Sequence, residues 1–470
     1  MRNNMNNLSG KAGLARAGAA EGSGPAGKLY TLFGFLTENR NPSQTIRKNA
    51  AWLFAGQIAS RVLRAAIVIY AARVLGADSW GAFSYALGVA TFLTVFSDIG
   101  IGALLTREGA RSPEFRDRYL GTAIGAKILL VIVVALGVTI LFPYLTNIEE
   151  ARVIMPILIF VFVFDTLRDL GSAFARALER MQTEAIAQVF TNLMIVVLGF
   201  ILLTKFGTSR SLAIAYATGS GLGLIGMGYA LRGYLMQSIR RFDVSLIRDI
   251  VTTAWPFGLF GIMGILMLNT DIIMLGWMRT PAEVGYYSAA QKFIQLLYVF
   301  PTIFASSLFP TLTRMVSENP EGAKRLLERA VAIAVVAAIP IAAIGIVLGP
   351  WIIPLFFGAA YLPAIRTFQI LMATVAIIFP SALVGNAIFA YGSERRFVYV
   401  VGIAVIGNVA MNAFLIPPFG IEGAAAATIV TQLIVNGIIW RKMQRLNGFA
   451  PREEIRRRIF QCLGKTLPAK

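Results

Sequence analysis

Two arginines, Arg61 and Arg64, lie three residues apart inside the apolar run 48–70 and could bind an anion. Gln57 precedes Arg61 by four residues, so a helix over this run would carry all three polar side chains on one face. A charge at the centre of a bilayer costs about 3 kcal/mol, so such residues usually face a watery cavity or a partner. We therefore expect a cationic patch for an anionic head group. The alternative is an arginine paired with a carboxylate that holds helices together.

A third cation, Lys292, lies in the apolar run 285–309 and is flanked by Gln291 and Gln295. At about 1.5 Å per residue it lies roughly 12 Å from the predicted outer end of that run. From the second half of the chain, Lys292 could face the two arginines across a cavity and complete a cationic binding site. The alternative is that its amine extends to the outer interface.

Four further charged residues lie in apolar runs toward the predicted cytoplasmic side, namely Asp98, Asp165, Arg168 and Asp169. The last three are spaced i, i+3 and i+4, which allows ion pairs within one helix. This pattern indicates a closed structural network or an inner gate, and ion coupling is the other candidate role. Lys127 and Arg366 lie within reach of an interface, so we expect them to extend toward it.

Asp271 follows Asn269 near the predicted outer end of the run 253–277. A carboxylate at this depth needs a cationic partner or a bound ion. Asp271 could pair with Lys292, or it could bind a coupling ion such as H⁺ or Na⁺.

Catalytic chemistry has little support in the sequence. Histidine is absent and Cys462 is the single cysteine, which removes His-based triads, disulfides and the usual metal ligand sets. The sequence Gly221 to Gly226 matches G-x-G-x-x-G, but it lies inside an apolar run rather than between a strand and a helix. We interpret these glycines as helix-packing positions. We expect no catalytic residue, no metal site and no cofactor beyond a coupling ion, and we find no P-loop for ATP hydrolysis.

The composition indicates an integral membrane protein. Hydrophobic residues make up 57% of the 470 residues and charged residues only 14%, with a mean hydropathy of +0.69. Runs of about 20 apolar residues can each cross the bilayer as a helix. We predict twelve such runs: 48–70, 82–105, 122–142, 152–174, 185–205, 211–231, 253–277, 285–309, 327–348, 364–390, 395–416 and 421–440.

The distribution of Lys and Arg predicts which loops are cytoplasmic. With the N-terminus inside, only five of the 43 cations fall in outer loops: Arg73, Arg152, Lys205, Arg210 and Arg279. Positive residues concentrate on the cytoplasmic side of membrane proteins. We therefore expect both termini in the cytoplasm. The net charge of +19 then serves insertion and attraction to anionic lipids rather than nucleic-acid binding.

An internal repeat predicts two lobes. Gly81–Ala86 and Gly285–Ala290 both read G-x-[FY]-S-x-A at the start of the second and eighth runs. A second pair, Phe206-Gly207 and Phe419-Gly420, precedes the sixth and twelfth runs. Since six runs separate the copies, both lobes keep one orientation. We predict an all-α membrane protein with two six-helix lobes, a pseudo-two-fold axis along the membrane normal and a central cavity.

The predicted organisation has five parts. A disordered cytoplasmic tail (1–45) precedes the first lobe (46–232), a cytoplasmic linker (233–250), the second lobe (251–442) and a basic cytoplasmic tail (443–470). In the region 345–365, the breaks at Gly349-Pro350-Trp351 and Pro354 favour an outer loop, 349–363. The alternative is that this stretch re-enters the membrane. All outer loops are short, which disfavours a polymerase or glycosyltransferase with a large extracytoplasmic catalytic loop.

Several segments, in this order, resemble the polysaccharide exporters of the multidrug, oligosaccharidyl-lipid and polysaccharide exporter superfamily. They are Asn49 to Trp52, Gln57 to Arg64, Ala72 to Gly76, Gly81 to Ser84, Asp271 to Gly276, Val284 to Ala290 and Leu308 to Pro310. Within that superfamily the chain is most similar to the O-antigen type of oligosaccharide flippase over roughly 45–445.

The resemblance implies a flippase in the bacterial inner membrane. Such a protein turns undecaprenyl-pyrophosphate-linked oligosaccharide to the periplasmic leaflet by alternating access, for O-antigen, capsule or exopolysaccharide synthesis. Its implied partners are this lipid, membrane lipids and the polymerase and glycosyltransferases of the same pathway. Ser60-Arg61 resembles a Ser-Arg pair of the related lipid II flippases, and Lys292 after Tyr286-Tyr287 stands where they have an arginine.

The main rival interpretation is a proton- or sodium-coupled exporter of small molecules, similar to the multidrug branch of the superfamily. That interpretation predicts an acidic, aromatic-lined cavity. Arg61 and Arg64 favour an anionic substrate instead, because a pyrophosphate carrying about two negative charges cannot enter a low-dielectric region without cations to compensate it.

Overall fold

The computed structural model describes residues 42–111, 113–239, 243, 245–392 and 394–462, and every regular element in these ranges is a helix. The first half comprises α3 (Pro42–Asp98), α4 (Ile101–Arg111), α5 (Pro113–Leu145), α6 (Glu149–Ala177), α7 (Met181–Phe206) and α8 (Ser209–Ile239). The second half comprises α9 (Leu246–Met278), α10 (Pro281–Leu297), α11 (Val299–Glu318), α12 (Pro320–Phe357), the 3₁₀ turn η1 (Ala359–Tyr361), α13 (Ala364–Ala390), α14 (Glu394–Asn447) and α15 (Arg452–Cys462).

Two of the longest helices each contain a break at a glycine. Gly76 in α3 has φ 72° and ψ 177°, and Gly420 in α14 has φ 58° and ψ −134°. A positive φ is readily adopted only by glycine, so these residues let the chain leave one helix and start the next. Each of α3 and α14 therefore carries two of the predicted apolar runs. We call the end of the molecule that holds Gly76 and Gly420 the Gly76 end, and the opposite end, where α3 begins, the Lys48 end.

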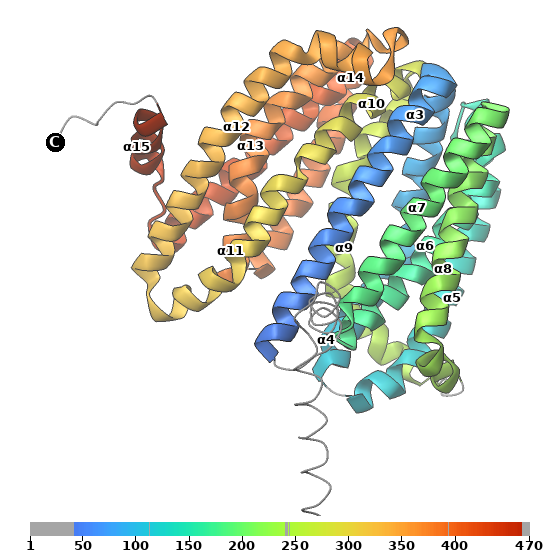
Figure 1. The fold of residues 1–470 in the computed structure, drawn as a ribbon, viewed down its shortest axis with the longest axis horizontal. Helices are drawn as coiled ribbons and strands as arrows, with labels where there is room; N and C mark the ends of the chain where they lie inside the picture. The colour runs from blue at the N-terminus through green and yellow to red at the C-terminus, as the bar shows by residue number, and fades with distance from the viewer. Residues whose placement is uncertain (1–41, 112, 240–242, 244, 393, 463–470) are drawn as a thin grey trace, which may run out of the picture.

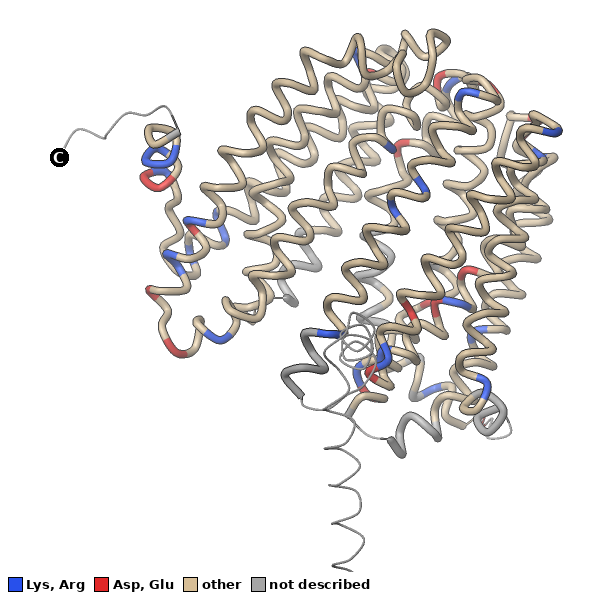
Figure 2. Tube along the Cα trace, viewed as in Figure 1, with Lys and Arg blue, Asp and Glu red and all other residues tan. Residues whose placement is uncertain are grey.

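The helices form two bundles side by side (Figure 1). The first lobe is built from α3–α8, where α3 packs on α6 and α7 and α8 packs on α6 and α7. The second lobe is built from α9–α14, where α13 packs on α12, α14 and α11. Many charged residues lie near the helix ends, and a smaller number lie along the middle of the bundles (Figure 2). The predicted two-lobe, all-α membrane fold is confirmed.

The number of membrane crossings stays a prediction. By length and apolar composition, seven helices among the described residues can cross a membrane, or up to eight if the bent pair formed by α3 and α4 is one span. The predicted run 285–309 is divided at Tyr298 between α10 and α11. Pro301 follows three residues later, and its missing N–H cannot bond to residue 297.

The prediction that prolines end the ninth run is wrong. Helix α12 continues to Phe357 with Pro340, Pro350 and Pro354 inside it, so the predicted loop over 349–363 is reduced to a short connection that contains η1. A proline lacks an N–H, but its carbonyl still accepts a hydrogen bond, as that of Pro354 does from the Gly358 N–H at 3.0 Å. Interruptions of this kind are tolerated in membrane helices because neighbouring groups satisfy the freed backbone.

The predicted tails and linker are partly helical. Helix α8 extends to Ile239 and α9 begins at Leu246, so little of the linker 233–250 is left, and 240–242 and 244 lie outside the described residues. Of the tail 1–45, residues 1–41 lie outside them, as do 463–470. The C-terminal tail contains the end of α14 and all of α15.

The two copies of the G-x-[FY]-S-x-A repeat face each other where the lobes meet. The Ser288 hydroxyl donates to that of Ser84 at 2.9 Å, and both side chains are buried. A Cβ on Gly81 would lie 1.8 Å from the Pro281 carbonyl oxygen, and one on Gly285 would lie 2.1 Å from that of Ala77. Each glycine thus contacts the residue four positions before the other glycine, as a two-fold relation requires. We call this contact the glycine seam.

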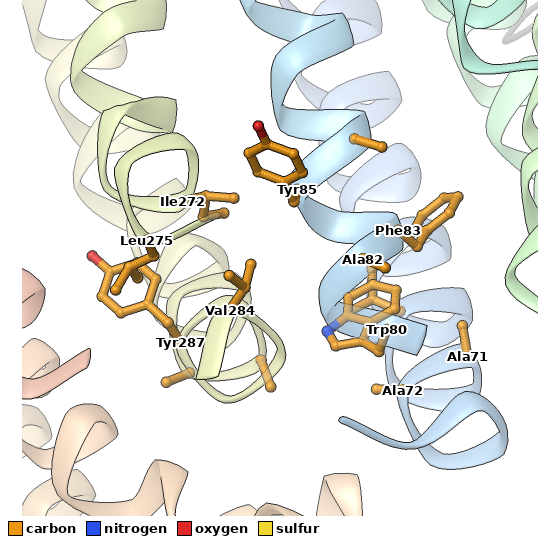
Figure 3. Packing of buried hydrophobic residues seen from close by; sticks show 14 of the residues in the cluster. Ala71, Ala72, Trp80, Ala82, Phe83, Tyr85, Ile272, Leu275, Val284 and Tyr287 are labelled. Atoms are coloured by element: carbon orange, nitrogen blue, oxygen red, sulfur yellow. The ribbon is translucent and has the colours of Figure 1, made fainter. Parts of the chain in front are cut away.

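Large apolar side chains surround the glycine seam. Tyr85 and Phe83 of α3 and Tyr287 of α10 are almost completely buried beside it, together with Ile272 and Leu275 of α9 (Figure 3). Burial of this apolar surface holds the two lobes together at the Gly76 end.

Candidate functional site

A cavity of about 430 Å³ lies between α3 and α7 of the first lobe and α10 of the second. Its polar lining residues are Gln57, Ser60, Arg61, Arg64, Gln188, Asn192, Lys292 and Gln295. The structure therefore brings together the three cations that the sequence predicts for the binding site. The lining residues include no carboxylate, so the cavity carries an excess of positive charge.

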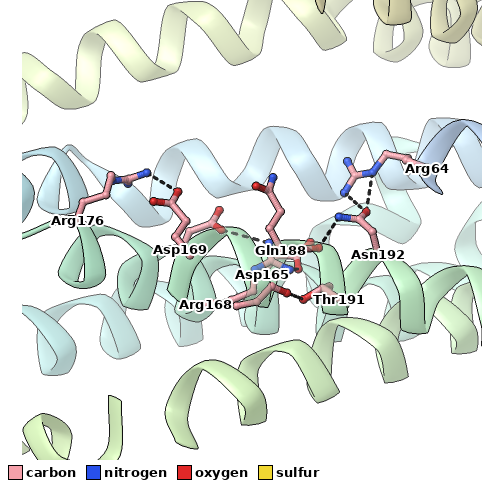
Figure 4. A network of polar contacts seen from close by, with 10 residues as sticks. Arg64, Asp165, Arg168, Asp169, Arg176, Gln188, Thr191 and Asn192 are labelled. Atoms are coloured by element: carbon pink, nitrogen blue, oxygen red, sulfur yellow. Dashed lines mark hydrogen bonds and ion pairs between the residues drawn. The ribbon is translucent and has the colours of Figure 1, made fainter. Parts of the chain in front are cut away.

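Helix α7 orients Arg64. Its Nε and a terminal guanidinium nitrogen donate to Oδ1 of Asn192 at 3.3 and 3.2 Å. The Nδ2 of Asn192 donates in turn to the Gln188 backbone carbonyl at 2.8 Å, one turn back along α7 (Figure 4). A neutral amide thus holds the guanidinium in place without neutralising it.

Arg61 and Lys292 have no hydrogen bond or ion pair with any other described residue, and both are only partly buried. A carboxylate partner for Arg61, the alternative derived from the sequence, is therefore not found among the described residues. Like charges close together in a region of low dielectric raise the local potential, and an anionic ligand would lower it.

The cavity is closed toward the Gly76 end. Phe357, at the end of α12, lines it and is 2% exposed. Beyond it, Nε of Arg73 donates to the Phe356 carbonyl at 2.7 Å and its guanidinium also contacts the Leu355 carbonyl. The Tyr361 hydroxyl donates to the Ala72 carbonyl at 3.0 Å. Burial raises the pKa of Tyr361, so this hydroxyl stays protonated and remains a donor at neutral pH.

A second polar cavity, of about 420 Å³, lies inside the first lobe and has a different charge pattern. Arg168 bonds to Asp165 at 2.7 Å and to Asp169 at 3.2 Å, which confirms that the i, i+3, i+4 spacing forms ion pairs within α6. Lys127 pairs with Asp98 at 2.5 Å, and Arg176 pairs with Glu184 at 2.7 Å. We call these seven residues the ion-pair cluster; five of them line the second cavity, namely Asp98, Lys127, Asp169, Arg176 and Glu184.

The prediction that Lys127 extends to an interface is wrong. Its side chain is 3% exposed, because α5 packs on α4 and α6 at this position and Asp98 accepts from its amine. Arg366 is 81% exposed, as expected of a residue near an interface.

Asp271 is 2% exposed and bonds to neutral groups only. Tyr287 donates to it at 2.5 Å, and Asn412 and Thr428 each donate at 2.7 Å. An ion pair with Lys292, one of the two alternatives derived from the sequence, is not among the ion pairs of the described residues, so that alternative is wrong. Asp271 lies outside the cationic cavity.

The sequence indicated Gln57, Ser60 and Gln295 of the cavity, but four neutral residues near the cations or near Asp271 were not predicted: Gln188, Asn192, Asn412 and Thr428. These are amides and a hydroxyl inside apolar runs, so that pattern could have indicated them. Tyr287 was named only in the repeat and in the Tyr286-Tyr287 pair, not as a partner of Asp271.

These features define a class of protein: an all-α membrane protein of two related bundles, with a cationic cavity between the bundles that is closed at one end. The chain matches the family described as polysaccharide biosynthesis protein over residues 46–316, more than half of its length, and it belongs to that family.

The chain is also similar to a named relative and, in its fold, to solved structures. The probable flippase AglR of Haloferax volcanii is 22% identical over 405 residues, which cover 83% of this chain and 81% of the relative. The fold is similar to that of the lipid II flippase MurJ in an inward closed conformation, with a TM-score of 0.72 and 16% identity over 88% of this chain and 94% of that chain.

An inward-facing multidrug resistance MATE family transporter of the MOP superfamily has a TM-score of 0.69 and 15% identity over 83% of this chain and 96% of that chain. These two likenesses show a shared fold. The family match over residues 46–316 confirms the resemblance to the polysaccharide exporters.

Proposed function

We propose that this protein is a flippase that moves undecaprenyl-pyrophosphate-linked oligosaccharide from the cytoplasmic to the periplasmic leaflet by alternating access. The product would serve the synthesis of O-antigen, capsule or exopolysaccharide. The observation that carries the proposal is the cavity between the lobes, where Arg61, Arg64 and Lys292 stand without a carboxylate among the lining residues.

The charge of the cavity favours a pyrophosphate over other ligands. Its two negative charges would be balanced by Arg61 and Lys292, which have no ion-pair partner among the described residues, and by Arg64, which Asn192 orients. The prenyl chain would stay in lipid, because only the head group needs compensation for leaving water. Flipping requires no bond to be made or broken, so the protein acts as a transporter rather than an enzyme.

The same lining disfavours export of cationic drugs, although the fold is similar to that of a multidrug transporter. A cation would meet three like charges in this cavity and would have to overcome their repulsion. We therefore place the small-molecule exporter second.

Ion coupling and gating belong to other parts of this proposal. Asp271 is the candidate for binding a coupling ion, H⁺ or Na⁺, and the ion-pair cluster is the candidate inner gate.

We further propose the bacterial inner membrane as the location, with both termini in the cytoplasm and with the pathway's polymerase and glycosyltransferases as partners. Cysteines at Asn147 and Ser317, in a variant without Cys462, should then react with impermeant reagents from the outside and the inside respectively. The reverse labelling would overturn this orientation.

The leaflet distribution of the lipid-linked oligosaccharide in cells depleted of this protein tests the proposed function. We expect complete oligosaccharide to accumulate in the cytoplasmic leaflet and to reach the periplasmic leaflet again on re-expression. Enzymes confined to one side of the membrane report the distribution. Normal arrival at the periplasmic leaflet, in a strain without a second flippase, would overturn the proposal.

A further inference from the structure

Three glutamines from three different helices line the cationic cavity. They are Gln57 of α3, Gln188 of α7 and Gln295 of α10. Each lies about one helical turn from a cation or from Asn192, which orients Arg64. Gln57 is four residues before Arg61, Gln188 is four before Asn192, and Gln295 is three after Lys292. We call these three residues the amide wall.

The amide wall lies on the side of the cations away from the closed end. Helices α3 and α7 run in the same direction, since Gly56 packs on Ala185 near their starts and Arg64 bonds to Asn192 farther along. Helix α10 begins at the glycine seam, so it runs away from the Gly76 end. On each helix the glutamine is therefore farther from the Gly76 end than the neighbouring cation or its partner.

The hydrogen-bonding groups of the amide wall are free. The side-chain amides of Gln57, Gln188 and Gln295 bond to no other described residue. Ser60 lines the same cavity, is 4% exposed and has a buried hydroxyl without a partner in the described part of the chain. Gln291 differs, because it lies outside this lining and donates to the Leu268 carbonyl at 3.3 Å.

Neutral amides and hydroxyls suit a different ligand group from the cations beside them. A glutamine amide both donates and accepts, as do the ring hydroxyls and acetamido groups of a sugar, whereas a phosphate offers acceptors and takes cations. The buried Ser60 hydroxyl also disfavours a ligand that does not bond to it, because the hydroxyl is then left unpaired.

We propose that Gln57, Gln188 and Gln295, together with Ser60, form the subsite that recognises the sugar attached to the pyrophosphate. This proposal rests on the proposed function and deepens it. Because Phe357 closes the cavity beyond the cations, the rest of the glycan extends away from the Gly76 end. The amide wall therefore selects for the first sugar, and it does not discriminate between glycans of different length.

Binding of defined lipids to the purified full-length protein tests this proposal. The probes are undecaprenyl methyl diphosphate, which has no sugar and is called the bare lipid, and undecaprenyl pyrophosphate carrying one N-acetylglucosamine, N-acetylgalactosamine, glucose or galactose. The methyl ester gives the bare lipid the same number of negative charges as the sugar-bearing lipids. We expect the wild type to bind at least one of the sugar-bearing lipids about tenfold or more tightly than the bare lipid, since one or two net hydrogen bonds of about 1 kcal/mol each give that ratio.

The test variant is the pair Gln57→Met and Gln295→Met, which keeps side-chain length and removes both amides. We expect it to lose the preference for the sugar while it binds the bare lipid as the wild type does, which also shows that it is folded. Gln461→Ala, on the exposed face of α15, is the matched control and should keep the preference.

Two results would overturn the amide wall: equal binding of the bare lipid and all four sugar-bearing lipids by the wild type, or an unchanged preference in the double Met variant. Failure of the proposed function gives a different result, in which Arg61→Ala with Lys292→Ala binds the bare lipid as tightly as the wild type does.

Discussion

The cationic cavity and the ion-pair cluster each contain three lysine or arginine side chains, and the two cavities have nearly equal volumes of about 430 and 420 Å³. In the cluster Lys127, Arg168 and Arg176 each bond to a carboxylate. In the cavity Arg64 bonds to a neutral amide, and Arg61 and Lys292 have no partner among the described residues. The two regions contain the same number of cations, so they differ in whether each cation is paired with a carboxylate.

Removing the unpaired cations should have the largest effect. We expect Arg61→Ala combined with Lys292→Ala to reduce export about 100-fold or more, because each charge-assisted contact to a phosphate contributes about 1.5–3 kcal/mol. Polymer production in a strain that lacks the chromosomal copy measures export, and immunoblotting of membranes measures the amount of protein. Lys292→Arg is the control and should keep function. Normal polymer from the double variant would show that the cations without a carboxylate partner are not needed for export.

Breaking a pair in the cluster should instead reduce stability. Asp98→Ala leaves the buried Lys127 amine unpaired, and we expect a loss of about 2 kcal/mol in the free energy of unfolding. This is below the usual cost of breaking a buried pair because Asp98 is 49% exposed. Thermal unfolding of the purified protein measures it.

The double variant Asp98→Ala with Lys127→Met removes both charges and should recover most of the stability. Equal loss in the single and double variants would show that the ion pair is not the cause.

Asn192→Asp would place a carboxylate beside a cation of the cavity, as in the ion-pair cluster. The new carboxylate would face Arg64 at the position where Oδ1 now accepts its hydrogen bonds. We expect binding of undecaprenyl pyrophosphate to weaken about tenfold, because Arg64 would be neutralised before the ligand arrives. Asn192→Ala removes the bond without adding charge and should weaken binding less. An unchanged affinity in Asn192→Asp would show that Arg64 does not contribute to the site.

Asp169→Asn should have the smallest effect. Asp169 is 66% exposed and its bond to Arg168 is longer than that of Asp165. An exposed ion pair contributes about 0.5 kcal/mol, so we expect export and the melting temperature to stay close to the wild type. A loss of export at normal stability would contradict this expectation and would assign Asp169 a direct part in the proposed inner gate.

Much of the fold could be predicted because a membrane protein must satisfy its backbone within helices and must pair or solvate its charges. The lengths of the apolar stretches predicted the membrane-spanning runs, and the internal repeat predicted the two lobes. The end of α12 was predicted wrongly because proline was treated as a stop, whereas Pro350 and Pro354 lie inside the helix.

The charged residues of the candidate site were predicted from the sequence, but their hydrogen-bond and ion-pair partners on other helices were not. Spacing along one helix predicts partners such as Asp165 and Arg168, which share α6. Lys127 and Asp98 come from different helices and are 29 residues apart, so nothing in the local sequence indicates their contact. The same holds for Arg64 and Asn192, whose contact depends on how α3 packs against α7.

The glycine seam has the form of an isologous interface, in which each half presents the same surface to the other. Interfaces of this kind normally join two identical subunits, so a single substitution in the gene changes both sides of the contact at once. Here both halves belong to one chain, and a change at Gly81 leaves Gly285 as it was. The seam can therefore be varied on one side at a time, a freedom that a symmetric dimer does not have.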